Sequence, residues 1–444
     1  MTATIDRGDG LVQLARSVLA DGVEPGEAEH RRRAVQWIDA HGFPTRREED
    51  WRYLPLAPVL DRPLRLPDAE ATREASVGAL DSVAAGFGGP RLVFVNGHFA
   101  PAASRLVGLP EGVTVEGAGG PGGEGGTTGS PPGPAPTTYR HAFEALNDAL
   151  GATGVVIRVP AGLVVSDPIQ LVYLSDPVSD PVGQAVLSSP RSTVVAGPGS
   201  SVGLVEHFVG HPDAAGMTNA VTTVRCAEGA RVDVDRVQDE APADFHLSLL
   251  DVRQDRGSRF SCRSFALGGS IARHEVRVRL AGEGAEASLE GLFVPRGDQF
   301  HDHPVLVEHL APHTRSRQWY VGVADGGGHG VFNGRIVVSA DAHGTDAGQV
   351  NRNVLLSDQA EIDTRPRLEI FTDDVRCTHG ATVGRLDQSA LFYLRSRGIP
   401  RPQARAILIH AVVDQIVGHV PLDAFRADVG RRLDRIIDGE GAPW

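Results

Sequence analysis

The sequence predicts a mainly β protein, with a parallel β-helix core between helical N- and C-terminal domains. Glycine-containing turns recur every 27 to 30 residues, at Gly199, Gly229, Gly257 and Gly284. An alternating apolar and polar strand follows each turn, and outside this region the apolar period becomes helical. A fixed period of short strands means that each unit buries its apolar face only by stacking on its neighbours. The even period favours a β-helix over a two-sheet sandwich.

Residues 1–153 are expected to form the helical N-terminal domain. Apolar positions on a charged background predict a helix over 26–40, ended by His41-Gly42. Residues 91–97 read as a strand that ends in a turn, and 139–150 as a short amphipathic helix. Within this domain, residues 117–136 consist largely of Gly, Pro, Ser and Thr. We expect them to be a flexible loop, because they cannot bury enough apolar surface to become ordered.

The β-helix core is predicted over 154–385, beginning with a strand at 154–159. Successive side chains of a strand point to opposite faces. The apolar set therefore points inward, and we expect the outward set to include Arg231, Asp233, Arg259 and Glu286. Two further strands are expected at 335–338 and 353–356. The segment 358–362 resembles a later copy of the repeat, after a less regular section.

Residues 386–444 are predicted to form the helical C-terminal domain. A helix over 387–397 should end at Gly398, because Pro400 prevents its continuation. The next helix, 402–417, and a last helix from about Leu422 are amphipathic, and are therefore expected to pack on the core or on a partner. Their apolar stripes are Ile407, Leu408, Ala411, Val412 and Ile416, and then Phe425, Val429, Leu433, Ile436 and Ile437.

Composition restricts the class of protein. The net charge of −13, without a dominant basic face, argues against nucleic-acid binding. Three widely spaced cysteines suit a reducing cytosol better than a disulfide framework. The first residues contain no apolar stretch of signal-peptide length, and no run approaches the length of a membrane span. We therefore expect a soluble, cytoplasmic protein with neither a nucleic-acid nor a membrane partner.

Cys377 and His379 are the first candidates for chemistry. On a strand, this spacing puts both side chains on one face with α-carbons roughly 6.5–7 Å apart. A shared metal ion or a thiolate–imidazole contact is then possible, and Arg376 or an imidazole close to the thiol would lower its pKa. Because a Cys-x-His pair is weakly specific, a buried thiol beside a hydrogen-bonded histidine remains the alternative.

Other polar clusters have plainer interpretations. Cys226 and Cys262 are expected to be small core residues, because Cys262 occupies an inward repeat position. The glycines of 326–330 lack the residues of a phosphate loop and are expected to form a tight turn. Four histidines within thirteen residues could bind zinc or iron but match no standard ligand spacing, so turn and strand roles are favoured; they are His301, His303, His309 and His313.

The densest set of motifs lies between residues 332 and 382, and it closely resembles the SufB/SufD family, scaffold components of the SUF iron–sulfur cluster assembly machinery. The likeness is dense over 290–420, looser over 139–290, and at the N-terminus carried mainly by 49–53; the 117–136 segment has no counterpart. Within the family, Cys-Thr-His-Gly is similar to the Cys-Ser-His-Gly of the SufD branch, and Thr378 keeps the hydroxyl. The motifs include Phe332-Asn333-Gly334-Arg335, Gln349-x-Asn351-Arg352-Asn353, Ala360-Glu361-Ile362-Asp363-Thr364 and Cys377-Thr378-His379-Gly380.

The resemblance implies a right-handed parallel β-helix and a non-catalytic scaffold subunit. It implies a complex with SufB, paired through the β-helix, and with two copies of the ATPase SufC, which would dock on the C-terminal helices. The nascent cluster would form at the SufB–SufD interface, where His379 and Cys377 transiently bind iron or cluster. The isolated chain would hold no stable cofactor, and could pair with itself. The resemblance assigns neither an iron donor nor a flavin site.

Two alternatives follow from the same residues. One is the paralogous SufB scaffold itself. The other is a polysaccharide-acting β-helix enzyme that would use carboxylates such as Asp363, Asp373 or Asp374. Such an enzyme is expected to be secreted and to carry an aromatic sugar platform. The chain has 5% aromatic residues and no signal-peptide pattern, which argues against it.

Overall fold

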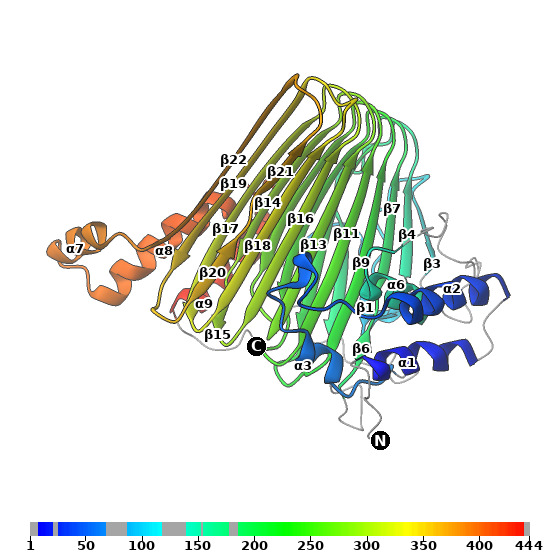
Figure 1. The fold of residues 1–444 in the computed structure, drawn as a ribbon, viewed down its shortest axis with the longest axis horizontal. Coiled ribbons are helices and arrows are strands. Elements are labelled where there is room, and N and C mark those ends of the chain that lie inside the picture. The colour runs from blue at the N-terminus through cyan, green and yellow to red at the C-terminus, as the bar shows by residue number, and fades with distance from the viewer. Residues whose placement is uncertain are drawn as a thin grey trace.

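The computed structural model describes residues 8–20, 25–67, 87–117, 139–151, 154–176 and 185–438. Its core is a parallel β-solenoid whose strands lie side by side in two sheets (Figure 1). Among the described residues every strand pairing is parallel, except β1 with β2 and β3 with β4. The first sheet has the order β2 (His98–Phe99), β1 (Arg91–Val95), β5 (Ile169–Ser175), β8 (Ser201–Gly210), β10 (Arg231–Asp239), β12 (Arg259–Ala266), β14 (Glu286–Phe293), β17 (Arg315–Gly326), β19 (Thr345–Leu355) and β22 (Val375–Arg385), with β15 (Arg296–Gly297) beside β17.

The second sheet faces the first across the solenoid interior. It begins at the same end of the solenoid as β22 and continues toward the N-terminal strands. Its order is β20 (Glu361–Thr364), β18 (His329–Val338), β16 (Phe300–His309), β13 (Ile271–Leu280), β11 (Phe245–Gln254), β9 (Met217–Cys226), β7 (Arg191–Ala196), β4 (Gly154–Val159) and β3 (Thr114–Gly117), with β21 (Arg367–Ile370) beside β18 and β6 (Leu187–Ser188) beside β9.

The glycine turns predicted from the sequence lie one above another in the solenoid. All four glycines have φ between +61° and +70°, the left-handed region that side chains with a Cβ rarely adopt. The strands after them, β8, β10, β12 and β14, pair in register, so that Leu204, Val234, Cys262 and Leu289 form one inward-facing row. These four side chains are at most 2% exposed. The repeat and its inward face are therefore confirmed.

Three details of the predicted repeat were wrong. Most strands of the solenoid's middle have 8 to 12 residues; the segment 335–338 is the last part of β18, and 353–355 is the last part of β19, which ends one residue before the predicted bound. The segment 358–362 leads into β20 of the second sheet, so it is not a copy of the first-sheet repeat. The next copy instead has His313 at the glycine position, with φ of +56°, followed by Gly344 with φ of +68°. Histidine is one of the residue types that tolerate this region.

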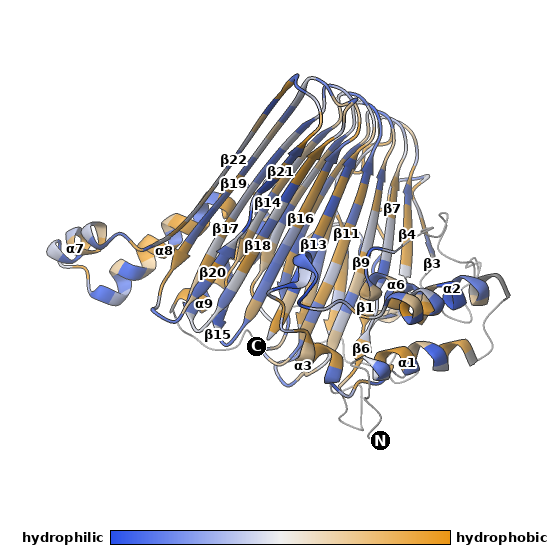
Figure 2. Cartoon of the chain, in the orientation of Figure 1, coloured by the Kyte–Doolittle hydropathy of each residue, from blue (hydrophilic) through white to orange (hydrophobic). Residues whose placement is uncertain are grey.

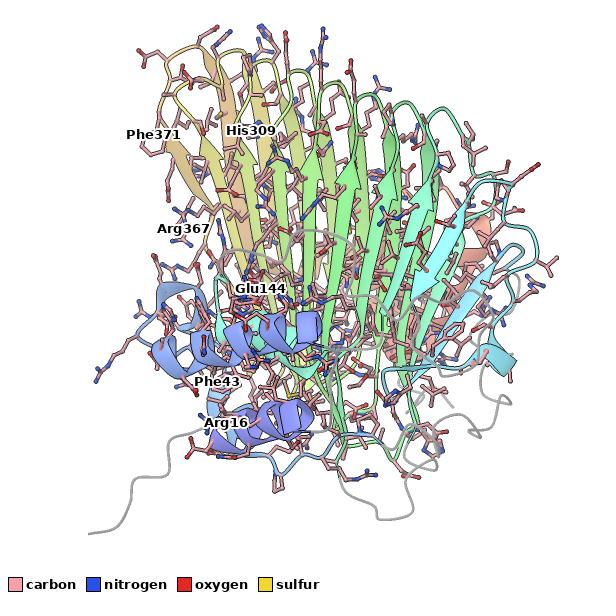
Figure 3. All side chains as sticks on the ribbon, turned by 90° about the vertical axis from the view of Figure 1, so that its right-hand side faces the viewer. Arg16, Phe43, Glu144, His309, Arg367 and Phe371 are labelled. Carbon is pink, nitrogen blue, oxygen red and sulfur yellow. The ribbon has the colours of Figure 1, made fainter. Side chains whose placement is uncertain are left out.

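The N-terminal helices cover part of the outer face of the second sheet, as Figures 1 and 3 show. Their apolar side chains form one buried cluster with outward residues of the sheet, among them Met217, Phe245 and Phe300. Residues 91–117 depart from the predicted helical domain, since they supply β1, β2 and β3 and contain only the three-residue 3-10 helix η3. Of the predicted loop 117–136, only Gly117 lies within the described residues. The helices are α1 (Asp9–Ala20), α2 (Pro25–His41), η1 (Glu49–Trp51), α3 (Leu56–Asp61), η3 (Pro101–Ala103) and α6 (Ala142–Leu150).

A polar clamp ties η1 to the last turns of the solenoid. Arg367 contacts Glu49 at 2.8 Å and Asp50 at 2.8 Å, although the paired residues are more than 300 positions apart. Beside them, the guanidinium of Arg273 lies 3.8 Å from the ring centroid of Trp51. Trp51, an aromatic residue of the segment 49–53, is 4% exposed and is therefore a core residue. The clamp fixes the N-terminal segment across the outer face of the second sheet.

The C-terminal helices α8 (Arg401–Val417) and α9 (Asp423–Asp438) pack against the outer face of the first sheet, whereas α7 (Gln388–Ser396) extends beyond the sheets (Figure 1). Ile409, Val413 and Ile416 of α8 are buried against that sheet. The predicted stripe of α8 was therefore wrong in part. Ile416 is buried, but Ile407 is 46% exposed and faces away from the sheet. Among the described helices, none combines the length and apolarity needed to cross a membrane. The domain divisions at 153/154 and 385/386 stay a prediction.

Candidate functional site

The strand β22 carries both leading candidates, Cys377 and His379. It is the last strand of the first sheet and pairs with β19 along its whole length, while its other edge is unpaired among the described residues. The register places Cys377 beside Ala347 and His379 beside Gln349. Because Ala347 and Gln349 point into the solenoid, both candidates lie on its inner face. Here the solenoid ends, so no further turn covers that face.

Solvent exposure is consequently high along β22. Cys377 is half-buried and His379 is exposed, whereas their neighbours Ala347 and Gln349 are each 1% exposed. The predicted sharing of one strand face by Cys377 and His379 is confirmed by this register. A donor pair that is fixed on a sheet and open to solvent can bind a metal ion that a partner also ligates.

The thiol of Cys377 is not activated in the manner expected from the sequence. Burial raises its pKa above the ordinary value, and the negative charge of Asp346 adds to this effect. A hydrogen bond with the backbone of Ala347 offsets part of the increase. Arg376 is the next residue on the strand and therefore points to the opposite face. The closeness to the thiol that Arg376 would need in order to lower this pKa is therefore not met; burial disfavours the thiolate, and a bound metal ion or a partner's positive charge would favour it.

His379 stands at the end of a row of buried amides. Gln349 follows it in the register, and Gln318 follows Gln349. The side-chain nitrogen of Gln349 donates to the side-chain oxygen of Gln318 at 2.8 Å. These two amides fill the inner face behind His379 and support its strand. The imidazole itself extends from this row toward solvent.

Cys226 and Cys262 are core residues, as predicted. They are 1% and 2% exposed. Burial raises the pKa of each thiol to about 12, so neither is a thiolate at neutral pH. They therefore differ from Cys377 in both access and surroundings.

The four histidines predicted as a second candidate do not converge. His301 is hydrogen-bonded to the backbone oxygen of Gly268, and His303 stacks on the rings of His274 and Phe293. His309 lies within hydrogen-bonding distance of two hydroxyls in the solenoid interior, and His313 occupies a turn. Among the described residues, no group of potential metal ligands includes any of these four side chains. Gly326, with φ of +63°, lies in the tight turn predicted for 326–330.

The acids proposed for a β-helix enzyme are also separated. Asp373 and Asp374 are exposed in the turn before β22, whereas Asp363 accepts a hydrogen bond from His329 at 2.9 Å in the second sheet. No local sequence pattern indicates this histidine–carboxylate contact. Aligning the second-sheet strands by the solenoid period would have found it, because β18 and β20 are direct neighbours.

Comparisons with known proteins agree with this architecture. Residues 180–412 match the family described as "SUF system FeS cluster assembly, SufBD core domain". The chain is 30% identical to the iron–sulfur cluster assembly protein SufD of Escherichia coli, over 91% of this chain and 92% of the relative. It is 28% identical to a SufBD family protein of Synechocystis, over 93% and 92% of the two chains. It is 26% identical to SufD of Bacillus subtilis, over 67% of each.

Proposed function

The chain belongs to the SufBD family of iron–sulfur cluster assembly proteins, and we propose that it is the SufD-type scaffold subunit of a cytoplasmic SUF complex. In this proposal SufB pairs with the chain through the end of the β-solenoid, and the ATPase SufC binds its C-terminal helices. The chain helps to acquire iron, and the nascent cluster forms between the two scaffold subunits. It performs no catalytic turnover of its own.

The observation that carries the proposal is the open edge of β22. An exposed strand edge presents unpaired backbone N–H and C=O groups, which pair readily with a strand of another protein. β22 is eleven residues long, about every second residue directs its N–H and C=O groups to the free edge, and Cys377 and His379 project from the same strand. Apolar side chains beside this edge are exposed as well, namely Phe371 (64%) and Val383 (44%). A partner strand added to β22 would therefore cover both donors.

The donor types suit iron and sulfide as cargo. Thiolate and imidazole groups are common iron ligands in proteins, and two such groups leave coordination positions for ligands from SufB. In the proposed assembly, sulfur arrives through SufB and the ion is held only until the cluster forms. A site shared between two chains explains why Cys377 and His379 lie open to solvent in this one.

Reconstitution of the chain with and without its partners tests this function. We expect co-expressed SufB and SufC to co-purify with the chain. Under anaerobic iron and sulfide, the complex should accumulate an iron–sulfur cluster, and the isolated chain should accumulate little. The measurement is iron and sulfide content together with visible absorption. A full, stable cluster on the isolated chain would instead indicate a SufB-type scaffold.

The proposed SufC surface consists of the outward apolar side chains of α7 and α8. Phe392 is 72% exposed, Tyr393 is 56% exposed and Ile407 is 46% exposed. Exposed aromatic side chains that gather on helices are typical of protein-binding surfaces. Deleting these helices would also uncover the apolar face of the first sheet. Substituting exposed residues is therefore the sharper experiment.

We expect Phe392→Asp to weaken SufC binding at least about tenfold, because burying a phenylalanine side chain is worth roughly 1.5–3 kcal/mol. Calorimetric titration of the purified chain with SufC measures the effect. The matched control is Val107→Asp, at a position that is 81% exposed before β3. Equal affinities for the two variants would place the SufC site elsewhere.

A further inference from the structure

A second cluster of potential metal ligands lies on the outer face of the second sheet. His329 of β18 is directly opposite Glu361 of β20, and Val331 is opposite Asp363. The side-chain period of two puts His329, Glu361 and Asp363 on one face. One ligand atom from each of the three residues lies within 4.8 Å of the other two. His329 Nε2 and Asp363 Oδ2 are 2.9 Å apart.

The charges of this cluster are unbalanced. Glu361 is exposed, and its carboxylate has no hydrogen bond or ion pair with the described residues. The two carboxylates come within 4.8 Å of each other and of the imidazole, an arrangement that a divalent cation would stabilise. One imidazole with two carboxylates is a donor set used for zinc, iron and other first-row ions.

The surroundings hold the histidine in place. The ring of Phe300 meets His329 edge to face, with centroids 4.9 Å apart, and Tyr53 approaches from the N-terminal segment at 6.5 Å. The backbone of Glu361 is fixed by a hydrogen bond to Gly328. The side chains of His329 and Asp363 are 25% and 27% exposed, so an ion could enter from solvent and remain partly shielded. A ligand set on two paired strands is more rigid than one on loops.

We propose that His329, Glu361 and Asp363 bind a divalent first-row transition metal ion, at a site separate from Cys377 and His379. β18 begins at His329 and ends at Val338. β19 then begins at Thr345, and its third residue, Ala347, pairs with Cys377. The two sites thus lie in different sheets and at opposite ends of the strands. That the ion in cells is Fe²⁺, held before it is built into a cluster, rests on the proposed function.

Anaerobic titration of the full chain with Co²⁺ tests the site, because the visible bands of Co²⁺ report its ligands. We expect the Cys377→Ala/His379→Ala double variant to retain one Co²⁺ site without thiolate ligation. Glu361→Gln and Asp363→Asn should each lower the affinity of that site at least about tenfold. Replacing a residue that only hydrogen-bonds to a metal ligand already lowers metal affinity about tenfold or more, so replacing a ligand should do at least the same. Glu283→Gln, at an exposed acid in a distant turn, is the control and should bind Co²⁺ normally.

Unchanged Co²⁺ affinity in both Glu361→Gln and Asp363→Asn would overturn the proposal, as would equal binding of Mg²⁺. Thermal unfolding of each variant checks that the solenoid is intact, and both substitutions keep side-chain size. The cluster-reconstitution experiment is independent of this titration. A failure of the metal site alone would leave the assembly role standing, and a failure of assembly alone would leave Co²⁺ binding unchanged.

Discussion

His379→Ala is expected to leave the chain folded and able to bind SufB and SufC, but to yield little iron–sulfur cluster in cells. The imidazole is exposed at the open end of the solenoid and packs into no core, so its removal should change the free energy of unfolding little. The measurement is iron and sulfide in the complex purified from cells, beside its thermal unfolding.

The control for this experiment is His343→Ala, at another exposed histidine, in the turn before β19. Cys377→Ala should be impaired to a similar or lesser degree than His379→Ala, because burial disfavours the Cys377 thiolate and thiolates of SufB can supply the remaining ligands. Normal iron and sulfide in the His379→Ala complex would show that β22 is not the assembly site.

Arg236→Met is expected to cause the largest loss of stability, about 3–5 kcal/mol, because it would leave a buried carboxylate without its partner. Arg236 Nε lies 2.7 Å from Glu206 Oε2 inside the solenoid, with side chains that are 3% and 0% exposed. Thr222 also donates to Glu206 at 2.7 Å, but a hydroxyl cannot neutralise its charge. Denaturant unfolding followed by circular dichroism measures the loss.

Two variants make this prediction specific. Arg231→Met removes a salt bridge on the same strand at a position where the arginine side chain is 60% exposed, and should cost less than about 1 kcal/mol. Arg236→Met combined with Glu206→Gln removes both charges and should recover most of the stability. If Arg236→Met is as stable as Arg231→Met, the buried pair contributes little to the fold.

The solenoid could be predicted because its rule is local. Each turn needs a residue with positive φ, and glycine is the residue that most often fills this position. Apolar and polar residues then alternate along the strand that follows the turn. The prediction failed where another residue met the same need. The fifth copy of the turn has His313 in place of glycine, so a search for glycine turns does not find it, and the segment 358–362 was assigned to the wrong sheet.

The candidate site was predicted in part for a similar reason. Neighbours on one strand, such as Cys377 and His379, share a face whatever the tertiary structure is. The direction in which the pKa of Cys377 shifts could not be predicted. It depends on how deeply the thiol is buried, and no local pattern reveals this. His329 and Glu361 were missed as neighbours because they are separated by a full turn of the solenoid. In α8, both faces carry apolar residues, so the sequence did not identify the face that packs on the sheet.

The clamp between η1 and β21 has a consequence for biosynthesis. Arg367 is made 317 residues after Asp50. At translation rates of about 5–20 residues per second, the N-terminal segment waits roughly 15–60 seconds for this contact. Trp51 can pack earlier, on Phe143 and Arg273, but the ion pairs of Glu49 and Asp50 with Arg367 cannot form during that time. The solenoid can add turns in order as they emerge and its N-terminal cover can pack on Met217 and Phe245, but the polar clamp closes only when the last turns have been synthesised.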